Sequence, residues 1–287
     1  MSPSPTNILA VIFDFDDTLI GDSTTKLLSQ YGIDTDKFWG KEVWQLVEDG
    51  YDPTLAWLGL FLDKVGQRKP LGRLTNGTLT EFGAHLDTGF APGIPSLFTD
   101  LQRLVRQHQD ISIEFYIVSG GLETVIRGSK IMKYVEEVYG CLLGENLRTG
   151  VVSKIRRCVT FTEKTRYLFE INKGLRLSDT WSDPYRVNAA VPEHERRIPF
   201  RNMIYVGDGL TDIPCFSLVK NMGGTAFGVF DPSNEASAKR AFEHLLQTGR
   251  VVSSHRAEYR KTDDLGMFLR TAVLQQCSRI SLERQQP

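Results

Sequence analysis

The feature that most constrains the fold is a set of short, continuously apolar segments that end in acidic or small residues. Residues 8–15 are rich in branched and aromatic side chains and end in acids, while residues 111–118 and 202–206 run into a Ser-Gly-Gly and a Gly-Asp-Gly sequence. Strands that are buried on both faces of a parallel sheet have this pattern. Because open parallel sheets build their sites at the carboxyl ends of the strands, we expect functional residues at these three ends.

Helical patterns lie between the expected strands. Residues 94–107 repeat apolar side chains at the i, i+3, i+4, i+7 spacing of an amphipathic helix, and residues 122–138, 162–172 and 263–276 have similar patterns. The alternation of strand and helix predicts an α/β fold with a Rossmann-like parallel sheet.

Residues 22–90 interrupt this alternation, because they have helical periodicity and little strand signal. We expect them to form a helical cap domain, inserted into a core domain that comprises residues 1–21 and 91–287. Two later segments also depart from the pattern: residues 139–161 predict a small hairpin, and the polar residues 178–200 predict a long connection.

Composition narrows the possible partners and compartments. The 287-residue chain has a net charge of -1, so it has no overall field for nucleic acid or anionic lipid, and we expect neither nucleic acid nor membrane as a partner. No stretch approaches the roughly 20 apolar residues that cross a bilayer. Residues 1–6 lack a signal-peptide pattern, and the four cysteines have no C-x-x-C spacing. We expect a reduced, cytoplasmic protein; its oligomeric state stays open.

The first chemical constellation is the acidic run at the end of residues 8–15. Residues i and i+2 of an extended segment face the same side, so Asp14 and Asp16 can share one cleft. Together with Asp17 they place three carboxylates in close quarters, which is unfavourable without a cation. Mg²⁺ prefers such oxygen ligands. The alternative is that these acids only cap the following turn or helix.

Two further strand ends carry polar groups. Asp208 and Asp212 follow residues 202–206, and they could complete a metal site with Asp14 if the two strands are neighbours; a plain loop is the alternative. Ser119 and Gly120 follow residues 111–118, where a hydroxyl and free backbone N–H groups can hold a phosphate. An ordinary strand-to-helix turn explains this second segment equally well.

A lysine is the expected cation for a bound phosphate. Lys164 would lie in the first turn of the helix 162–172, where the helix dipole disfavours a positive charge, so we prefer it as a site residue. Lys173 would lie at the other end of this helix, where a lysine is favourable for structural reasons, and it is the second choice.

Taken together, the motifs resemble those of the haloacid dehalogenase superfamily of phosphohydrolases. The run from Asp14 to Leu19 resembles the first motif, Ser119-Gly120-Gly121 the second, Lys164 the third, and residues 207–212 the fourth. The resemblance extends from about residue 8 to residue 230. The helical insertion is similar to the type 1 cap of the phosphoserine phosphatase-like branch. Dehalogenases lack the second aspartate of the first motif, so Asp16 favours phosphate chemistry.

The resemblance implies a magnesium-dependent phosphatase that acts on a small phosphorylated metabolite. Asp14 would attack phosphorus and form an aspartyl-phosphate, and Asp16 would serve as general acid and then general base. Mg²⁺ would be held by Asp14, the backbone carbonyl of Asp16, and Asp208, with Asp212 binding through water.

The same resemblance implies that Ser119, Gly120 and Lys164 would stabilise the oxygens of the transferring phosphoryl group. Two alternatives remain: a phosphotransferase or mutase on the same core, and a non-catalytic, magnesium-dependent phospho-acceptor module. Specificity would come from side chains that face the cleft, and the candidates are Lys41, Trp44, Arg68, Arg73 and Arg127.

Overall fold

The computed structural model describes residues 7–285 of the chain. The predicted core domain also includes residues 1–6 and 286–287, which lie outside the described residues. Residues 1–6 are also the segment in which no signal-peptide pattern was found.

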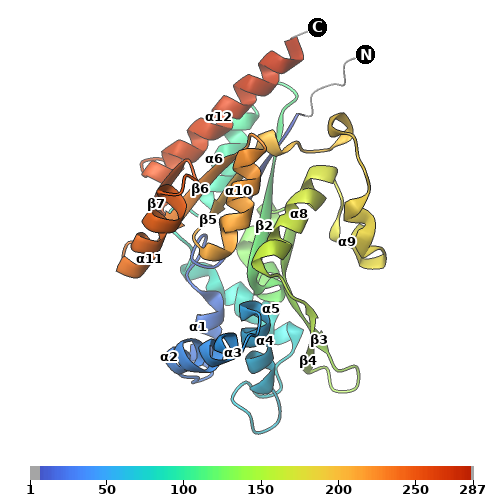
Figure 1. Ribbon diagram of the computed structural model, residues 1–287, viewed down its shortest axis with the longest axis vertical. Helices are drawn as coiled ribbons and strands as arrows, with labels where there is room; N and C mark the ends of the chain where they lie inside the picture. The colour runs from blue at the N-terminus through green and yellow to red at the C-terminus, as the bar shows by residue number, and fades with distance from the viewer. Residues whose placement is uncertain (1–6, 286–287) are drawn as a thin grey trace.

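A seven-stranded sheet in the order β4-β3-β2-β1-β5-β6-β7 forms the centre of the molecule (Figure 1). Neighbouring strands are parallel except for β3 and β4, which form an antiparallel hairpin. The α/β fold, its parallel sheet and the hairpin within residues 139–161 are therefore confirmed. The strands are β1 (Ile8–Phe13), β2 (Ser112–Leu122), β3 (Glu137–Glu145), β4 (Val152–Arg157), β5 (Met203–Gly207), β6 (Thr225–Phe230) and β7 (Ser253–Arg256).

The register of the three central strands aligns their carboxyl ends. Phe13, the last residue of β1, pairs with Ile117 of β2 on one side and with Val206 of β5 on the other. Residues 9–13 are completely buried, as expected for a strand covered on both faces. The residues that follow these three positions therefore meet at a single edge of the sheet.

A bulge interrupts β2 at this edge. Val118 pairs with Tyr139 of β3, but the next pair is Leu122 with Cys141, so four residues of β2 advance against two of β3. Three residues, Ser119, Gly120 and Gly121, thus stand against the single Gly140, and they were expected to form a turn after the strand. A bulge leaves backbone groups out of the sheet ladder, and they become available for other partners.

The prediction of one helix over residues 122–138 is wrong in its second half. Helix α7 (Glu123–Gly128) ends where the Ser129 hydroxyl donates to the carbonyl of Ile126, and Ser129 itself has extended backbone angles. A short 3₁₀ helix, η3 (Lys130–Tyr134), follows, and β3 already begins at Glu137. The end of the segment 122–138 therefore belongs to β3, which pairs with β2, and not to a helix.

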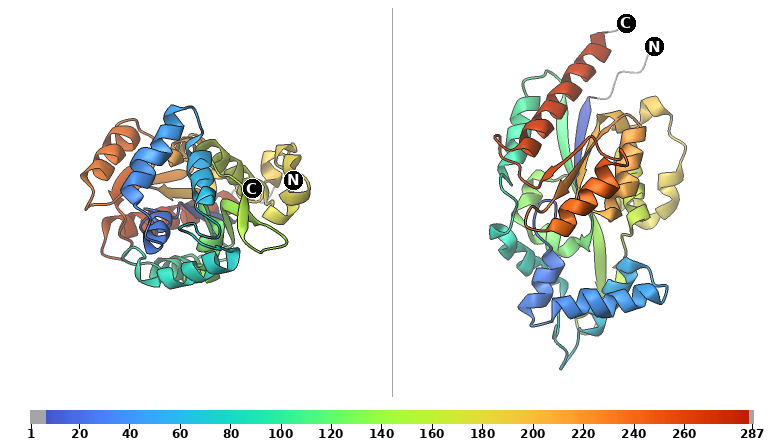
Figure 2. Two further views of the ribbon diagram at one scale, coloured as in Figure 1. Left: turned by 90° about the horizontal axis from the view of Figure 1, so that it is seen from below. Right: turned by 60° about the vertical axis from the view of Figure 1, so that its left-hand side comes forward.

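Helices cover both faces of the sheet (Figures 1 and 2). Helices α6 (Ser96–Val105) and α12 (Asp264–Gln285) pack together on one face, and α8 (Phe161–Lys173) and α10 (Ile213–Asn221) pack together on the other. The helices predicted at 94–107, 162–172 and 263–276 are confirmed. No helix within residues 7–285 combines the length and apolar character needed to cross a membrane.

Residues 23–84 are mostly helical and lie beyond the carboxyl edge of the strands (Figure 1). The helical character expected of this segment is confirmed, whereas the limits of a separate cap domain at 22 and 90 stay a prediction. Its last α-helix packs closely on α7 of the sheet-bearing part. The elements are α1 (Ser23–Gln30), α2 (Thr35–Lys37), the π-helix η1 (Phe38–Val43), α3 (Trp44–Glu48), α4 (Pro53–Asp63) and α5 (Asn76–Ala84).

Residues 178–200 form the expected excursion from the sheet. It contains the end of α9 (Leu177–Ser182) and two short 3₁₀ turns, and it leads from α8 to β5 at the side of the molecule (Figure 1). The last α-helix before β7 is α11 (Glu235–Arg240), and the π-helix η8 (Ala241–Leu246) follows it.

Candidate active site

Asp14 lies directly after β1 and is held by both its backbone and its side chain. Its N–H donates to the carbonyl of Val206 at 2.9 Å, which continues the pairing of β1 with β5. Its Oδ1 accepts the N–H of Phe15 at 2.7 Å, and its Oδ2 accepts Lys164 Nζ at 2.8 Å. The side chain is only 8% exposed, so its orientation is fixed before any substrate arrives.

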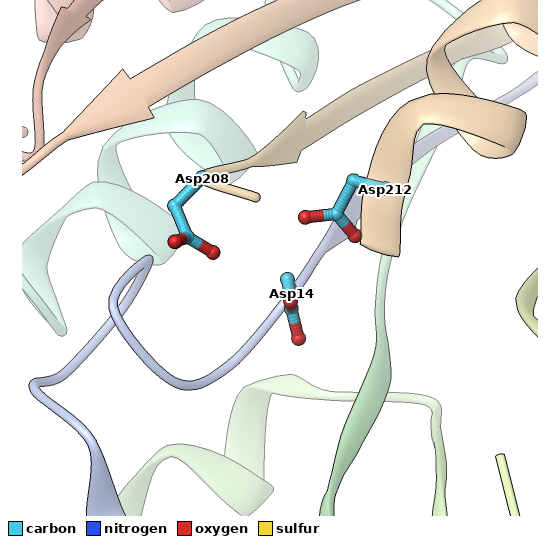
Figure 3. Close-up of side chains that lie close together, drawn as sticks. All are labelled: Asp14, Asp208 and Asp212. Atoms are coloured by element: carbon cyan, nitrogen blue, oxygen red, sulfur yellow. The ribbon is translucent and has the colours of Figure 1, made fainter. Parts of the chain in front are cut away.

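Asp14, Asp208 and Asp212 form a compact acidic cluster (Figure 3). One carboxylate oxygen from each lies within 4.8 Å of those of the other two. Asp208 follows β5 directly, and Asp212 ends the 3₁₀ turn η7 (Leu210–Asp212). Gly207 permits this turn, because a Cβ there would stand 2.5 Å from Asp212 Oδ2.

The electrostatics of this cluster favour a bound cation. Burial raises the pKa of Asp14 to about 6, because the lowering effect of Lys164 only partly offsets it and Asp212 raises it further. Burial also raises the pKa of Asp208 well above its ordinary value, with additional repulsion from Asp212 and Asp14. Carboxylate oxygens are the ligands that Mg²⁺ prefers, so these three residues fit a magnesium ion.

Lys164 joins two members of the cluster. Its Nζ donates to Asp14 Oδ2 at 2.8 Å and to Asp212 Oδ1 at 2.7 Å, and the side chain is 1% exposed. Burial alone would lower the pKa of Lys164, but the two carboxylates outweigh burial and raise it above its ordinary value. Lys173 donates instead to the backbone carbonyls of Val187 and Ala189, at the far end of α8. The lysine in contact with the acidic cluster is therefore Lys164.

The Asp16 carboxylate lies between the start of α1 and the bulge in β2. Its Oδ1 accepts the N–H of Ser23 at 2.8 Å, at the start of α1. A Cβ on Gly121 would stand 2.4 Å from Asp16 Oδ2, so only glycine leaves room for this carboxylate. Burial and the neighbouring Asp22 raise the pKa of Asp16 to about 8, so this carboxyl group holds a proton at neutral pH.

Ser119 and Gly120 form the bulge beside Asp16. Ser119 is 1% exposed, and its hydroxyl accepts the N–H of Gly121 at 3.1 Å. The bulge thus lies against Asp16, while α8 reaches the Asp14 carboxylate through Lys164. The structure thus brings together Asp14, Lys164, Asp208 and Asp212 by contact, with Asp16 and the bulge residues adjacent.

Two groups near the site were not anticipated from the sequence. Tyr205 Oη donates to Asp212 Oδ1 at 2.7 Å from inside β5. Glu123, the first residue of α7, is buried; it accepts the N–H of Gly140 at 3.2 Å and forms ion pairs with Arg127 and Arg157. In the sequence, Tyr205 has the pattern of an ordinary core residue. For Glu123, the only indication in the sequence is that a charged residue directly follows the bulge.

The candidate specificity residues do not contact the acidic cluster. Trp44 is 59% exposed and donates to Glu48 on its own helix, while Arg73 donates to the backbone of Thr149. Arg127 is held by Glu123 and Glu137. Lys41 and Arg68 are exposed.

The fold is a Rossmann-like α/β sheet, and the carboxyl ends of its strands carry a buried aspartate–lysine pair and an acidic cluster. This combination is typical of a class of hydrolases. The chain belongs to the haloacid dehalogenase-like hydrolase family, whose model matches residues 11–217. All the site residues above lie within this span, and the predicted family membership is confirmed.

The chain is also similar to a protein of another organism in sequence and to solved structures in fold. An uncharacterized protein of Borreliella burgdorferi is 33% identical over 239 residues, which cover 75% of this chain and 80% of the relative. Among solved structures, a HAD family hydrolase from Salmonella enterica subsp. enterica serovar Typhi has a TM-score of 0.55 at 15% identity, over 90% of this chain and 70% of that chain. A phospho-aspartyl intermediate analogue of phosphoserine phosphatase has a TM-score of 0.51 at 13% identity, over 92% and 99%.

Proposed function

We propose that the protein is a magnesium-dependent phosphatase that hydrolyses a small phosphomonoester through an aspartyl-phosphate on Asp14. One observation carries this proposal: the Asp14 carboxylate is held by buried Lys164, next to Asp208 and Asp212, with a second aspartate, Asp16, two residues along the chain. A single carboxylate at a strand end has many uses. A fixed carboxylate beside a cation site and a separate protonated acid is suited to phosphoryl transfer.

In the first step, an oxygen of the Asp14 carboxylate attacks phosphorus while the bond from phosphorus to the alcohol oxygen breaks. Asp16 gives its proton to the departing alkoxide, which agrees with a pKa of about 8. Backbone N–H groups of the bulge at Ser119 and Gly120, together with Lys164, stabilise the charge on the phosphoryl oxygens.

In the second step, Asp16 is a carboxylate and takes a proton from water, whose oxygen attacks the phosphorus of the aspartyl-phosphate. The bond to Asp14 breaks and inorganic phosphate leaves. Mg²⁺, bound by Asp14 and Asp208 with support from Asp212 and the backbone of Asp16, would offset repulsion between the nucleophile and the phosphate.

The position of the helical segment supports a small substrate. Residues 23–84 lie beyond the carboxyl edge of the sheet, where a cap would close over a small metabolite more readily than over a phosphoprotein (Figure 1). The free thiols of all four cysteines are consistent with the cytoplasm, our proposed location.

Hydrolysis of p-nitrophenyl phosphate, with and without Mg²⁺, tests the reaction. Asp14→Asn should abolish turnover, whereas Asp49→Asn, which changes an exposed carboxylate of the helical segment, should retain it. Asp16→Asn should release one nitrophenol per enzyme in a burst and then stall, because nitrophenolate needs no acid to leave but the aspartyl-phosphate still needs a base. Full turnover by Asp14→Asn would overturn the proposal.

A screen of phosphorylated metabolites, with released phosphate measured directly, then identifies the substrate. Transfer of the phosphoryl group to a second alcohol, without release of phosphate, would instead identify a phosphotransferase or mutase.

A further inference from the structure

Two cysteines that are distant in the sequence meet behind the bulge in β2. The last antiparallel pair of the hairpin before the sheet edge is Leu142 of β3 with Arg157 of β4. Cys141 precedes Leu142 on β3 and Cys158 directly follows Arg157 at the end of β4, so continuing this register places the two cysteines opposite each other, and their thiols are close enough to hydrogen-bond. Directly opposed residues of an antiparallel pair have Cα atoms about 4.5–5.5 Å apart, within the range that a disulfide can bridge.

The thiol of Cys141 is a structural support of the bulge. Its Sγ donates to the carbonyl of Gly120 at 3.2 Å, and it accepts the N–H of Val159 at 3.2 Å. Cys141 is completely buried, so no water can replace these partners. One sulfur atom thus connects the phosphate-binding bulge with the segment that follows β4.

Cys158 has the properties of the more reactive thiol. It is partly exposed, whereas Cys141 is buried. When the Cys141 S–H turns from the Gly120 carbonyl to the Cys158 sulfur, its hydrogen bond lowers the pKa of Cys158, and this effect outweighs burial and the nearby carboxylates of Asp52 and Glu163, which raise it. The thiolate is the form of cysteine that reacts with oxidants, so oxidation should begin at Cys158.

We propose that Cys141 and Cys158 are a redox-sensitive pair, which a peroxide joins by a disulfide that deforms the bulge at Gly120 and stops catalysis. The effect on catalysis rests on the proposed phosphatase function, whereas the formation of the bond does not.

The oxidation is balanced with hydrogen peroxide as the oxidant. The Cys158 thiolate sulfur gives two electrons to one peroxide oxygen, the O–O bond breaks, and a sulfenic acid and hydroxide form; the proton that the Cys158 thiol released converts the hydroxide to water. The Cys141 sulfur then attacks the Cys158 sulfur, the S–O bond breaks, and the hydroxyl leaves as a second water with the Cys141 proton. Two thiols and one peroxide give one disulfide and two waters, and a dithiol reverses the change.

The disulfide acts on the site from two sides. Cys141 loses the proton that it donates to Gly120, and its sulfur must turn toward Cys158, so the bulge loses its support. Cys158 also lies two residues before Thr160, whose side chain caps α8, the helix that carries Lys164. A displacement of about 1 Å at such a site lowers the rate by about a hundredfold.

The test treats the magnesium-loaded protein with hydrogen peroxide and then measures intact mass and hydrolysis of p-nitrophenyl phosphate. The parent should lose the mass of two hydrogens, show a Cys141–Cys158 crosslinked peptide, and lose about a hundredfold in activity, which dithiothreitol restores. Cys158→Ser should keep its own untreated activity after peroxide. Cys277→Ala, which removes a buried thiol on α12, should stay as sensitive as the parent.

Cys141→Ser gives a second signature that does not depend on activity. It keeps the reactive Cys158 but has no partner thiol, so its mass should rise by oxygen instead of falling by two hydrogens. A parent that forms no Cys141–Cys158 crosslink would overturn the proposal. A crosslink in an enzyme of unchanged activity would overturn the regulatory effect, and a crosslink in a protein that never hydrolyses phosphate would point to a failure of the proposed function instead.

Discussion

Replacement of Lys164 by methionine should destabilise the protein more than the loss of any surface charge. The variant removes a positive charge that donates to Asp14 at 2.8 Å and to Asp212 at 2.7 Å. All three side chains are almost completely buried, at 1%, 8% and 0% exposure. Removing one partner of a buried ion pair costs about 3–5 kcal/mol, because a buried carboxylate remains without compensation.

The free energy of unfolding is measured by urea titration, followed by far-UV circular dichroism, at pH 8 in EDTA. A chelator is needed because a divalent cation would replace part of the lost positive charge. In saturating Mg²⁺ the deficit of the variant should therefore shrink. Activity toward p-nitrophenyl phosphate should fall by about 10²–10³, the usual cost of removing one donor to the reacting group.

Lys173→Met is the matched control on the same helix. Lys173 donates to the carbonyls of Val187 and Ala189, away from the acidic cluster, so its loss should cost about 1 kcal/mol and leave activity near the parent value. A deficit for Lys164→Met in EDTA below about 1 kcal/mol, or equal deficits for the two variants, would refute the reasoning from buried charge.

Three further predictions follow from the same geometry. Burial raises the pKa of Glu170 from its ordinary 4.5 to about 7, against the lowering effect of Arg166. The folded state therefore binds more protons than the unfolded state, and the free energy of unfolding falls as the pH rises through this window. Relative to the parent, the free energy of unfolding of Glu170→Gln should rise by about 2–3 kcal/mol from pH 5 to pH 8, measured by urea unfolding. An equal effect at both pH values would contradict this. Gly121→Ala should lower kcat by about a hundredfold in stopped-flow assays, because its Cβ would displace the Asp16 carboxylate, and unchanged kcat would show that Asp16 can move freely. Asp208→Asn should abolish the rise in melting temperature that Mg²⁺ gives the parent, measured by differential scanning fluorimetry; a preserved rise would place the metal elsewhere.

The sequence predicted those parts of the site that lie directly at strand ends. Asp14 and Asp208 follow apolar runs, and the physics of a buried parallel sheet brings such ends together without further information. The bulge at Ser119 was not predictable, because it depends on how β2 pairs with β3. Strands β6 and β7 were not predicted either. β7 (Ser253–Arg256) is a polar edge strand, which lacks the apolar run of a central strand.

Side chains that reach the site from within a helix or strand were also not predictable from the sequence. Tyr205 has the pattern of a core residue, and its hydrogen bond to Asp212 exists only because η7 folds back toward β5. The pairing of Cys141 with Cys158 depends on the register of a hairpin, which the sequence placed only approximately. Periodicity describes one element at a time, whereas these contacts depend on how two elements are aligned.

The central position of β1 has a consequence for synthesis of the chain. Phe13 is among the first residues made, yet its partner Ile117 comes much later and its other partner, Val206, later still. Chains emerge and fold from the N-terminus, so a growing chain carries a fully apolar strand with no partner until β2 is made, and with one edge still unpaired until β5 is made. Asp14, the proposed nucleophile, is thus made early, but the proposed catalysis requires the third quarter of the chain, which carries Asp208 and Asp212, to fold around it. A ribosome-bound fragment that ends before β5 should therefore need a chaperone to protect β1, and it should carry no activity.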